Sequence, residues 1–138
     1  MKKKILITGA TGFVGSHMAD YILKNHSNCQ LFATKRYHLS RLDKIQHVYE
    51  KIKWIDCDIT DPIATEKMIR IVKPDKIFHF AAIVPTVKVN SNMKKALLVN
   101  YIGTKNIIDT INKFSKKKVW FFYSSTSHVY NFYKNKQK

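Results

Sequence analysis

The sequence predicts an α/β fold of the Rossmann type, a doubly wound parallel sheet with strand order 3-2-1-4-5. Short apolar segments alternate with segments of helical periodicity, which is the pattern of a parallel sheet with right-handed crossovers. Three regularly spaced glycines directly follow the first apolar segment. A length of 138 residues and a hydrophobic content of 45% suit one domain with its own core, so residues 1–138 are expected to form a single domain.

The three glycines lie where the first strand must turn sharply into a helix. Ile5–Thr8 is the expected strand, and residues 8–15 read TGATGFVG. Gly9 suits the tight turn, Gly12 would let the backbone approach a pyrophosphate, and Gly15 would let the helix pack close to the strand. The helix N-terminus adds unpaired N–H groups and a positive dipole. The junction therefore predicts a dinucleotide site.

The later elements continue the alternation. Four further strands, each apolar enough to be buried on both faces, are expected at residues 31–33, 52–57, 77–82 and 119–124. Helices are expected over residues 13–23, from Asp61-Pro62 to just before Pro74, and from about Asn92 to Phe114. Their buried faces are expected to carry Val14, Met18, Tyr21 and Ile22; Ile63, Met68, Ile69 and Val72; and Leu97, Leu98, Tyr101, Ile107, Ile108 and Ile111.

The chain carries a formal net charge of +16, which a nucleic-acid-binding domain would also show. The excess is nearly all lysine, with only three arginines, and it is spread over the expected helix faces and termini. The longest run, Lys116-Lys117-Lys118, lies where a helix ends, and cations there suit the helix dipole. A solvated surface without a specific nucleic-acid partner is therefore favoured, and a nucleic-acid-binding domain stays as the weaker alternative.

The cysteines and the hydropathy pattern bear on location. Cys29 and Cys57 fall with the expected second and third strands and show no metal-ligand spacing. We therefore expect buried, reduced thiols and no metal site. No stretch is long enough to span a membrane. A cytoplasmic protein without a membrane partner is expected.

The glycine spacing departs from the general Gly-x-Gly-x-x-Gly fingerprint and resembles that of one family. Thr-Gly-x-x-Gly-x-x-Gly at residues 8–15 is similar to the signature of the extended short-chain dehydrogenase/reductase family, which includes nucleotide-sugar epimerases, dehydratases and reductases. The alternative is an ordinary glycine-rich turn that binds nothing. The resemblance implies an NAD(P)-binding domain whose cofactor contacts Gly9, Thr11, Gly12, Phe13, Val14 and Gly15.

Two segments after the expected strands extend the resemblance. Asp58 and Ile59 match the family's Asp-Leu-Thr-Asp segment, whose acid and apolar residue flank the adenine. In the plainer alternative, Asp58 only shapes a turn and Asp61 caps the next helix. His-Phe-Ala-Ala at residues 79–82 resembles the family's His-x-Ala-Ala motif, which implies that the ribose and nicotinamide lie against Phe80, Ala81 and Ala82.

His79 and Asn100 are assigned supporting roles. A lone histidine within an apolar strand is usually a hydrogen-bonded core residue, so His79 is not taken as catalytic. Asn100 matches the family's helix asparagine, which implies that it ties its helix to the strand ends beside the cofactor.

The end of the second strand bears on the choice of dinucleotide. An acid there accepts the ribose 2′-hydroxyl of NAD, whereas an arginine accommodates the 2′-phosphate of NADP. This chain has Thr34-Lys35-Arg36 and, a few residues on, Arg41. We therefore predict NADP, with Arg36 at the phosphate, and keep NAD as the alternative.

The catalytic prediction rests on the last segment. Residues 121–130 resemble the family's fifth-strand segment, which implies that Thr126 hydrogen-bonds the reacting sugar oxygen. His128 stands where related sugar dehydratases have a glutamate, which argues against dehydration. Tyr130 and Lys134 have the spacing of the family's Tyr-x-x-x-Lys motif, but they lie too close to Thr126 for the chain to form a helix and turn back.

The sequence therefore predicts the cofactor-binding portion of an NAD(P)-dependent nucleotide-sugar epimerase, reductase or dehydratase, an enzyme by family. Residues 32–61 resemble the GDP-sugar dehydratase and reductase branch most. We expect the fold to stop after its fifth strand, without a Tyr-x-x-x-Lys motif or a substrate subdomain, and to associate as a homo-oligomer because an edge strand stays open. A stand-alone dinucleotide-binding or regulatory module without catalysis is the alternative.

Overall fold

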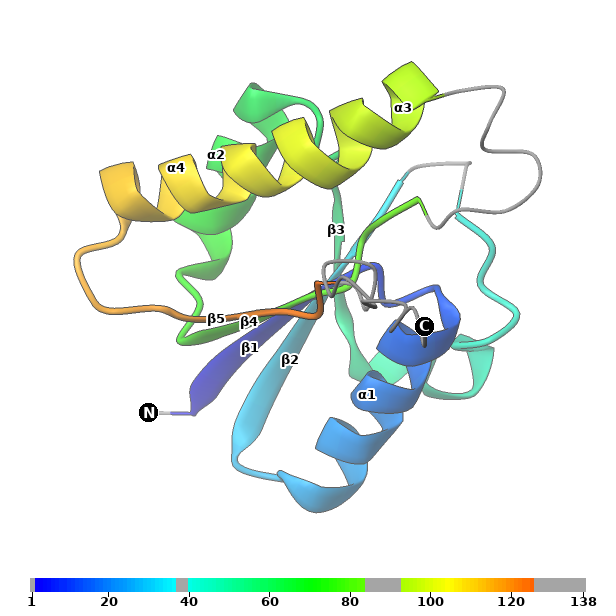
Figure 1. Cartoon of the computed structure of the whole chain (residues 1–138). Helices are drawn as coiled ribbons and strands as arrows, with labels where there is room; N and C mark the ends of the chain where they lie inside the picture. Colours follow the sequence, from blue (N-terminus) through cyan, green and yellow to red (C-terminus); the bar gives the residue numbers. More distant parts are fainter. Residues whose placement is uncertain (1, 37–39, 84–92, 126–138) are drawn as a thin grey trace, which may run out of the picture.

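A five-stranded parallel sheet forms the centre of the molecule (Figure 1). The computed structural model describes residues 2–36, 40–83 and 93–125. The strand order is β3-β2-β1-β4-β5, so the predicted order is confirmed. The strands are β1 Lys3–Thr8, β2 Cys29–Lys35, β3 Lys53–Asp56, β4 Lys76–His79 and β5 Trp120–Tyr123.

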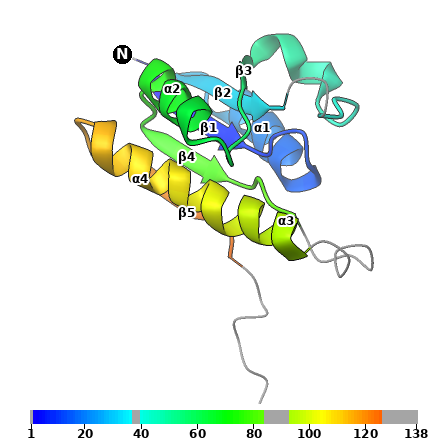
Figure 2. The ribbon, with the colours of Figure 1, turned by 90° about the horizontal axis from the view of Figure 1, so that it is seen from above.

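Helices cover both faces of this sheet (Figures 1 and 2). Helix α1, Phe13–Asn25, lies on one face with the 3₁₀ helix η1, Gln46–Lys51. Helix α2, Pro62–Val72, lies on the other face beside one continuous helical stretch. That stretch consists of α3 Met93–Leu97, the π-helix η3 Leu98–Gly103 and α4 Thr104–Phe114. In residues 2–36, 40–83 and 93–125, no helix has both the length and the apolarity to cross a membrane.

The central strand β1 supplies both hydrophobic cores. Ile5 and Ile7 point into the core under α1, and Leu6 points into the core under α2 and α4. Successive side chains of a strand alternate between the faces, so a strand covered on both sides must be apolar throughout. The first core also contains Ala10, Ala19, Ile22, Leu31, Ala33, Ile45 and Ile52, and the second contains Phe32, Cys57, Ile59, Met68, Ile69, Val72, Ile77 and Ile107.

The ends of α2 form as the sequence predicts. The Asp61 carboxylate accepts hydrogen bonds from the backbone N–H groups of Ile63 (2.8 Å) and Ala64 (3.2 Å), which caps two orphan donors of the first turn. Lys73 ends the helix in the left-handed region, with φ of 50°, just before Pro74. The N-terminal cap by Asp61 adds about 1 kcal/mol to the free energy of unfolding.

The predicted buried faces of α1 and α2 are partly wrong. Val14 and Tyr21 are exposed, and the buried residues of α1 are Gly15, Ser16, Ala19 and Ile22. Small residues line this contact because α1 packs close to the sheet, and bulky side chains at 14 and 21 are turned to its flanks. Ile63 of α2 is 79% exposed, while Met68, Ile69 and Val72 are buried as expected.

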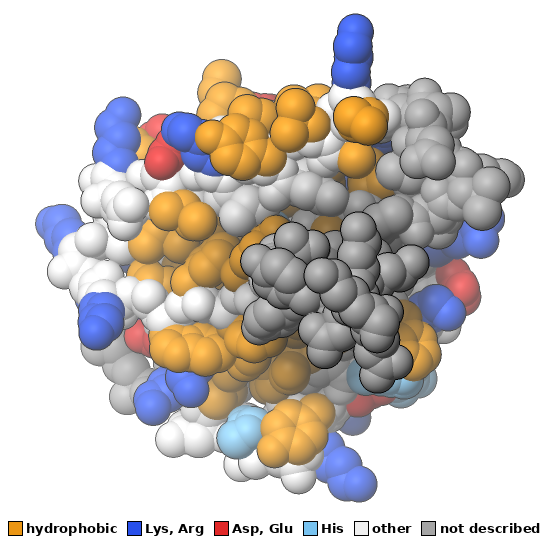
Figure 3. Space-filling model, viewed as in Figure 1, with side chains coloured by type: hydrophobic (Ala, Val, Ile, Leu, Met, Phe, Trp, Pro, Cys, Tyr) orange, Lys and Arg blue, Asp and Glu red, His pale blue; other side chains and the backbone are white. Residues whose placement is uncertain are grey.

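The third helix also differs from the prediction, in its form and in its buried face. Four of its six expected core residues, Leu97, Leu98, Tyr101 and Ile108, are exposed, and Ile107 is fully buried. The wider π turn shifts the phase of the residues before it relative to those after it, so a single 3.6-residue stripe does not describe the contact. Apolar side chains consequently lie on the surface seen in Figure 3.

Candidate functional site

A pocket of about 250 Å³ lies at the carboxyl ends of β1 to β4. Its wall comes from the last two residues of β2 and from the segments that follow the four strands, with one further residue, Val99, from η3. The chain runs from β1 outward to β2 and β3, then returns to β4 on the opposite side of β1. In open α/β sheets this reversal of strand order leaves a crevice in which ligands bind.

The glycine turn after β1 lies against the segment that follows β4, without space for side chains. Gly9 has φ of 76°, and a Cβ there would lie 2.6 Å from the backbone nitrogen of Ala81. A Cβ at Gly15 would lie 2.2 Å from the carbonyl oxygen of Gly9. The turn and the helix packing predicted for these two glycines are therefore confirmed.

Gly12 differs because its missing side chain leaves the pocket open. A Cβ at Gly12 would meet only the Gly9 carbonyl oxygen, at 3.3 Å, and Gly12 lines the pocket. Gly12 is also the N-cap of α1, where no side chain caps the helix and no acid occupies the first turn. The N–H groups of the first turn and the positive end of the helix dipole together suit an anion at this point.

Two arginines and a serine line the pocket beyond β2. Arg36 and Arg41 are exposed at its wall, and Ser40 lies between them. The Ser40 hydroxyl accepts a hydrogen bond from the Arg36 backbone N–H (2.9 Å), and the Ser40 N–H donates to the Arg36 carbonyl (3.1 Å). Lys35 instead forms an ion pair with Asp56, 3.1 Å from its Oδ1. Lys35 lines the pocket as well, so three cations lie at this strand end, of which Lys35 is paired with Asp56.

Asp58 and Ile59 line the pocket below the end of β3. One carboxylate oxygen of Asp58, Oδ1, accepts hydrogen bonds from the N–H (3.0 Å) and hydroxyl (2.8 Å) of Thr60. Asp58 thus shapes the turn, as the plainer alternative holds, while its side chain also faces the pocket. Ile59 is buried beneath Gly103, where a Cβ would come within 2.7 Å of its side chain.

His79 is a core residue, as predicted. It is 2% exposed, and its Nδ1 lies 2.6 Å from the Thr8 hydroxyl while its Nε2 lies 2.8 Å from the Thr104 hydroxyl. Thr104 donates its proton to the Asn100 carbonyl, so it accepts from Nε2–H, and Thr8 donates to Nδ1. Burial of the ring lowers the pKa of His79 to about 4, so the imidazole is neutral near pH 7.

Asn100 ties the helical stretch to the segment after β4. Its Oδ1 accepts from the Ile83 N–H (2.7 Å) and its Nδ2 donates to the Ile83 carbonyl (2.9 Å). The tie itself is therefore confirmed. Asn100 does not line the pocket, but its neighbour Val99 and its partner Ile83 do.

Cys57 adds a neutral group to the pocket wall. It is buried and free, and burial raises the pKa of its thiol to about 11. A protonated thiol is neither a nucleophile nor a metal ligand at neutral pH. Within the described part of the chain, no group of three or more His, Cys, Asp or Glu side chains is placed to hold a metal ion.

Comparison with known proteins identifies the family. The family model described as GDP-mannose 4,6 dehydratase matches residues 6–136. The chain belongs to the GDP-mannose 4,6-dehydratase family. It is 33% identical over 137 residues to the GDP-mannose 4,6 dehydratase of Drosophila melanogaster, covering 93% of this chain and 34% of that protein. The chain thus spans about a third of the length of the curated relatives it matches.

Solved structures confirm the fold. The UDP-Glc/GlcNAc 4-epimerase of Campylobacter jejuni matches 86% of this chain and 36% of its own, with a TM-score of 0.74 and 26% identity. The dTDP-glucose 4,6-dehydratase of Bacillus anthracis, a complex with NAD, matches 81% of this chain and 34% of its own, with a TM-score of 0.67 and 20% identity. The predicted resemblance to the epimerase and dehydratase type is confirmed.

The structure gathers most of the residues that the sequence singles out in this member of the GDP-mannose 4,6-dehydratase family. Phe13 and Val14 are exposed on the first turn of α1 and do not line the pocket, and Gly15 is buried beneath the turn. Thr126 lies outside the described residues, as do His128, Tyr130 and Lys134. The predicted cofactor-binding residues that do line the pocket are Gly9, Thr11, Gly12, Arg36, Asp58, Ile59, Phe80, Ala81 and Ala82.

Sequence reasoning missed several residues of the pocket wall. The position directly after a strand would have indicated Cys57, because residues at strand ends face the crevice. No local signal identifies Val99, which reaches the pocket from a helix, or Ser40. The other lining residues without a predicted role are Thr34 and Ile83.

Gly15→Ala is expected to lower the free energy of unfolding by roughly 3 kcal/mol, because the added methyl overlaps the Gly9 carbonyl and displaces α1. Gly12→Ala is the matched control, and its extended backbone and a single added contact, at 3.3 Å, should keep its effect below about 1 kcal/mol. Urea unfolding followed by circular dichroism measures both values. Equal destabilisation by the two substitutions would contradict the close packing at Gly15.

The His79 ring makes stability depend on pH. Its pKa is about 4 in the folded chain and about 6.5 in the unfolded chain, so the unfolded state binds the extra proton between these values. The contribution of the neutral His79 ring to the free energy of unfolding is fully present above about pH 6.5 and is lost as the pH falls. Between pH 7 and pH 5 we expect a loss of about 2 kcal/mol.

Urea unfolding at a series of pH values tests this prediction. His79→Gln should remove most of the loss between pH 7 and pH 5, whereas His26→Gln, at an exposed position, should retain it. An unchanged slope in His79→Gln would show that other groups cause the pH dependence.

Proposed function

We propose that residues 1–138 form the cofactor-binding portion of an NAD(P)-dependent enzyme that acts on nucleotide sugars. The observation that carries the proposal is the pocket between the ends of β1 and β4, where the strand order reverses. The glycine turn and the uncapped N-terminus of α1 lie together at this pocket. Family membership and the relatives' names, which include dehydratases, decarboxylases and an epimerase, support the substrate class.

The residues around the pocket fit a dinucleotide. A pyrophosphate would receive hydrogen bonds from the first turn of α1, where Gly12 offers no side chain to block it. The Oδ2 atom of Asp58 would accept from the adenine amino group, since Oδ1 is held by Thr60. Phe80, Ala81 and Ala82 would lie along the ribose and nicotinamide at the end of β4.

The charges at the end of β2 favour NADP over NAD. The last residue of β2 is Lys35, and the acid that would accept a ribose 2′-hydroxyl is absent from this position. Arg36 and Arg41 line the same end of the pocket, where two guanidinium groups would bind a phosphate by charge-assisted hydrogen bonds. NAD, which is present in the Bacillus anthracis structure, is the alternative.

The proposed reaction is a reversible oxidation at a sugar carbon. Bound nicotinamide supplies this chemistry by exchanging a hydride with that carbon through its C4 atom. Thr126 is proposed to hydrogen-bond the reacting sugar oxygen, since a hydroxyl can donate to a carbonyl or accept from an alcohol. Asn100 and the neutral His79 would keep the helical stretch and β4 in place beside it. Because His128 stands where related sugar dehydratases have a glutamate, oxidation, reduction or epimerisation is favoured over dehydration.

We also propose a substrate class, self-association and a cellular location for this chain. A nucleotide sugar is the proposed substrate. Self-association is proposed because Leu97, Tyr101 and Trp120 expose large apolar side chains. A cytoplasmic location is supported by the free thiols of Cys29 and Cys57.

Titration with NADP and NAD, followed by fluorescence or calorimetry, tests the proposed pocket. Gly12→Ala should weaken dinucleotide binding at least about tenfold while leaving stability nearly unchanged, because its methyl group occupies the space proposed for the pyrophosphate. Lys24→Ala, in the last turn of α1, should bind like the original chain. The proposal fails if neither dinucleotide binds or if Gly12→Ala has no effect.

The preference for NADP depends on two of the three arginines. Arg36→Ala and Arg41→Ala should each lower the affinity for NADP about tenfold and that for NAD little, because only NADP carries the 2′-phosphate. Arg70→Ala, on α2, is the matched control and should leave both affinities unchanged. Tighter binding of NAD by the original chain, or an unchanged ratio in the variants, would contradict the preference.

A further inference from the structure

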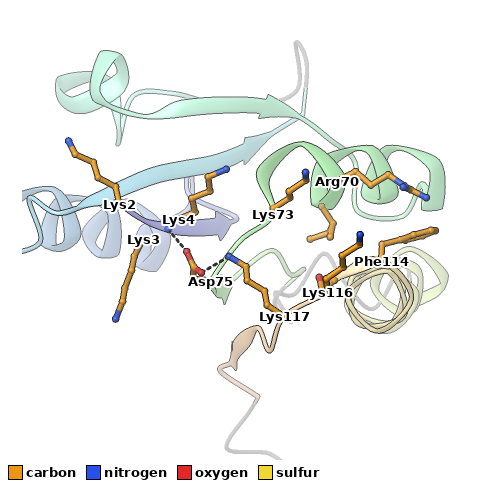
Figure 4. Close-up of a pocket in the computed structure, with 11 residues that line it drawn as sticks. Lys2, Lys3, Lys4, Arg70, Lys73, Asp75, Phe114, Lys116 and Lys117 are labelled. Carbon is orange, nitrogen blue, oxygen red and sulfur yellow. Dashed lines mark hydrogen bonds and ion pairs between the residues drawn. The ribbon is translucent and has the colours of Figure 1, made fainter.

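A second pocket, of about 760 Å³, lies at the opposite end of the sheet (Figure 4). It opens between the start of β1, the end of α2 and the end of α4. This pocket shares no lining residue with the proposed dinucleotide site at the carboxyl ends of the strands. Its volume is in the range that small-molecule sites occupy, about 300–1,000 Å³.

The wall of this pocket is strongly cationic. Seven of its side chains are lysine or arginine, and one, Asp75, is an acid. Asp75 is already engaged, because it accepts a hydrogen bond from the Lys4 backbone N–H (2.7 Å) and forms a short ion pair with Lys117. These contacts hold the pKa of Asp75 below its usual range, so its single negative charge is present at neutral pH.

Several cations of the wall form no side-chain hydrogen bond or ion pair with a described residue. Among them, Lys73 and Lys116 are exposed, and neither side chain forms a hydrogen bond or ion pair with a described residue. They lie on two elements, the end of α2 and the segment after α4, on either side of the space in Figure 4. Arg70 is different, since it pairs with Glu66 at 2.7 Å.

The helix ends do not account for so much positive charge. The C-termini of α2 and α4 each present roughly half a negative charge, about one unit in total. Together with Asp75 and with Glu66, which pairs with Arg70, this offsets about three of the seven cations in the wall. Like charges held near one another raise the free energy of the folded chain, and a multivalent anion would relieve that repulsion.

The aromatic content of the wall decides between an oligophosphate and a nucleic acid. Phe114 is the one aromatic residue of the pocket wall, within the described residues. Its ring already contacts the Arg70 guanidinium, 3.9 Å from the ring centroid, and Lys113 Nζ, at 5.0 Å. Proteins that bind single strands stack bases on free aromatic faces, and this pocket offers none. Lysine ammonium groups bind phosphate as point charges and need no base.

We propose that this pocket binds a short inorganic oligophosphate, with Lys73 and Lys116 as its principal ligands and Lys117 beside them. Electrostatic attraction of this kind weakens as ionic strength rises. The same triphosphate group could also come from a nucleoside triphosphate. This binding is independent of the dinucleotide pocket.

Calorimetric titration of the 138-residue chain with inorganic tripolyphosphate tests the proposal. Lys73→Gln combined with Lys116→Gln should lower the affinity about tenfold. Lys44→Gln combined with Lys51→Gln, which changes the net charge equally away from the pocket, should lower it less than about threefold. If the first pair does not fold, as judged by circular dichroism, Lys116→Gln alone should cost about threefold.

Three further arms separate the alternatives. The Arg36→Ala and Arg41→Ala variants must keep tripolyphosphate binding, which separates this site from the proposed NADP site. If ATP binds with an affinity similar to that of tripolyphosphate, the pocket recognises the triphosphate group. If ATP binds more than about tenfold more tightly, the pocket recognises the nucleoside and the proposal is overturned. The proposal is also overturned if tripolyphosphate does not bind, or if the two double lysine variants lose affinity equally. Tighter binding of single-stranded DNA that depends on Lys73 and Lys116 would overturn it as well.

Discussion

Direct backbone contact between the glycine turn, β4 and α1 is the constraint on which the rest of this structure depends. Gly9 brings the chain against Ala81, and Gly15 brings α1 against Gly9, at separations that no side chain could occupy. The helix can therefore begin immediately after the central strand, with its axis aimed at the crevice. Any residue larger than glycine at either position would move α1 and change the shape of the pocket.

The opposite wall of the crevice is held by side chains rather than by close backbone packing. A chain of hydrogen bonds runs from Thr8 of β1 through His79 of β4 to Thr104 and Asn100 of the helical stretch, and from there to Ile83. Every polar atom in it has a partner, so the buried imidazole stays neutral and fixed. The two walls are thus positioned by different means but share β1 and β4.

Charge is distributed differently at the two ends of the sheet. At the carboxyl end, two arginines line a pocket that also contains one acid, Asp58, and an uncapped helix N-terminus, which suits a ligand that carries both phosphate and hydrogen-bonding groups. At the amino end, lysines outnumber the single carboxylate and surround the C-termini of two helices. The high net charge of this chain therefore includes a local concentration and is more than an evenly solvated surface.

The sequence alone determined the strand order, the glycine turn, the Asp61 cap and the core role of His79, because each depends on local patterns or on residue types with few conformational choices. It did not determine which helix faces are buried, since Tyr21 and Leu97 satisfy a helical period yet remain exposed. The packing of the folded chain is what brings Ser40 and Val99 to the crevice and places Lys73 and Lys116 on either side of the second pocket. Those groupings arise from segments distant in sequence, and their positions depend on how the helices pack against the sheet.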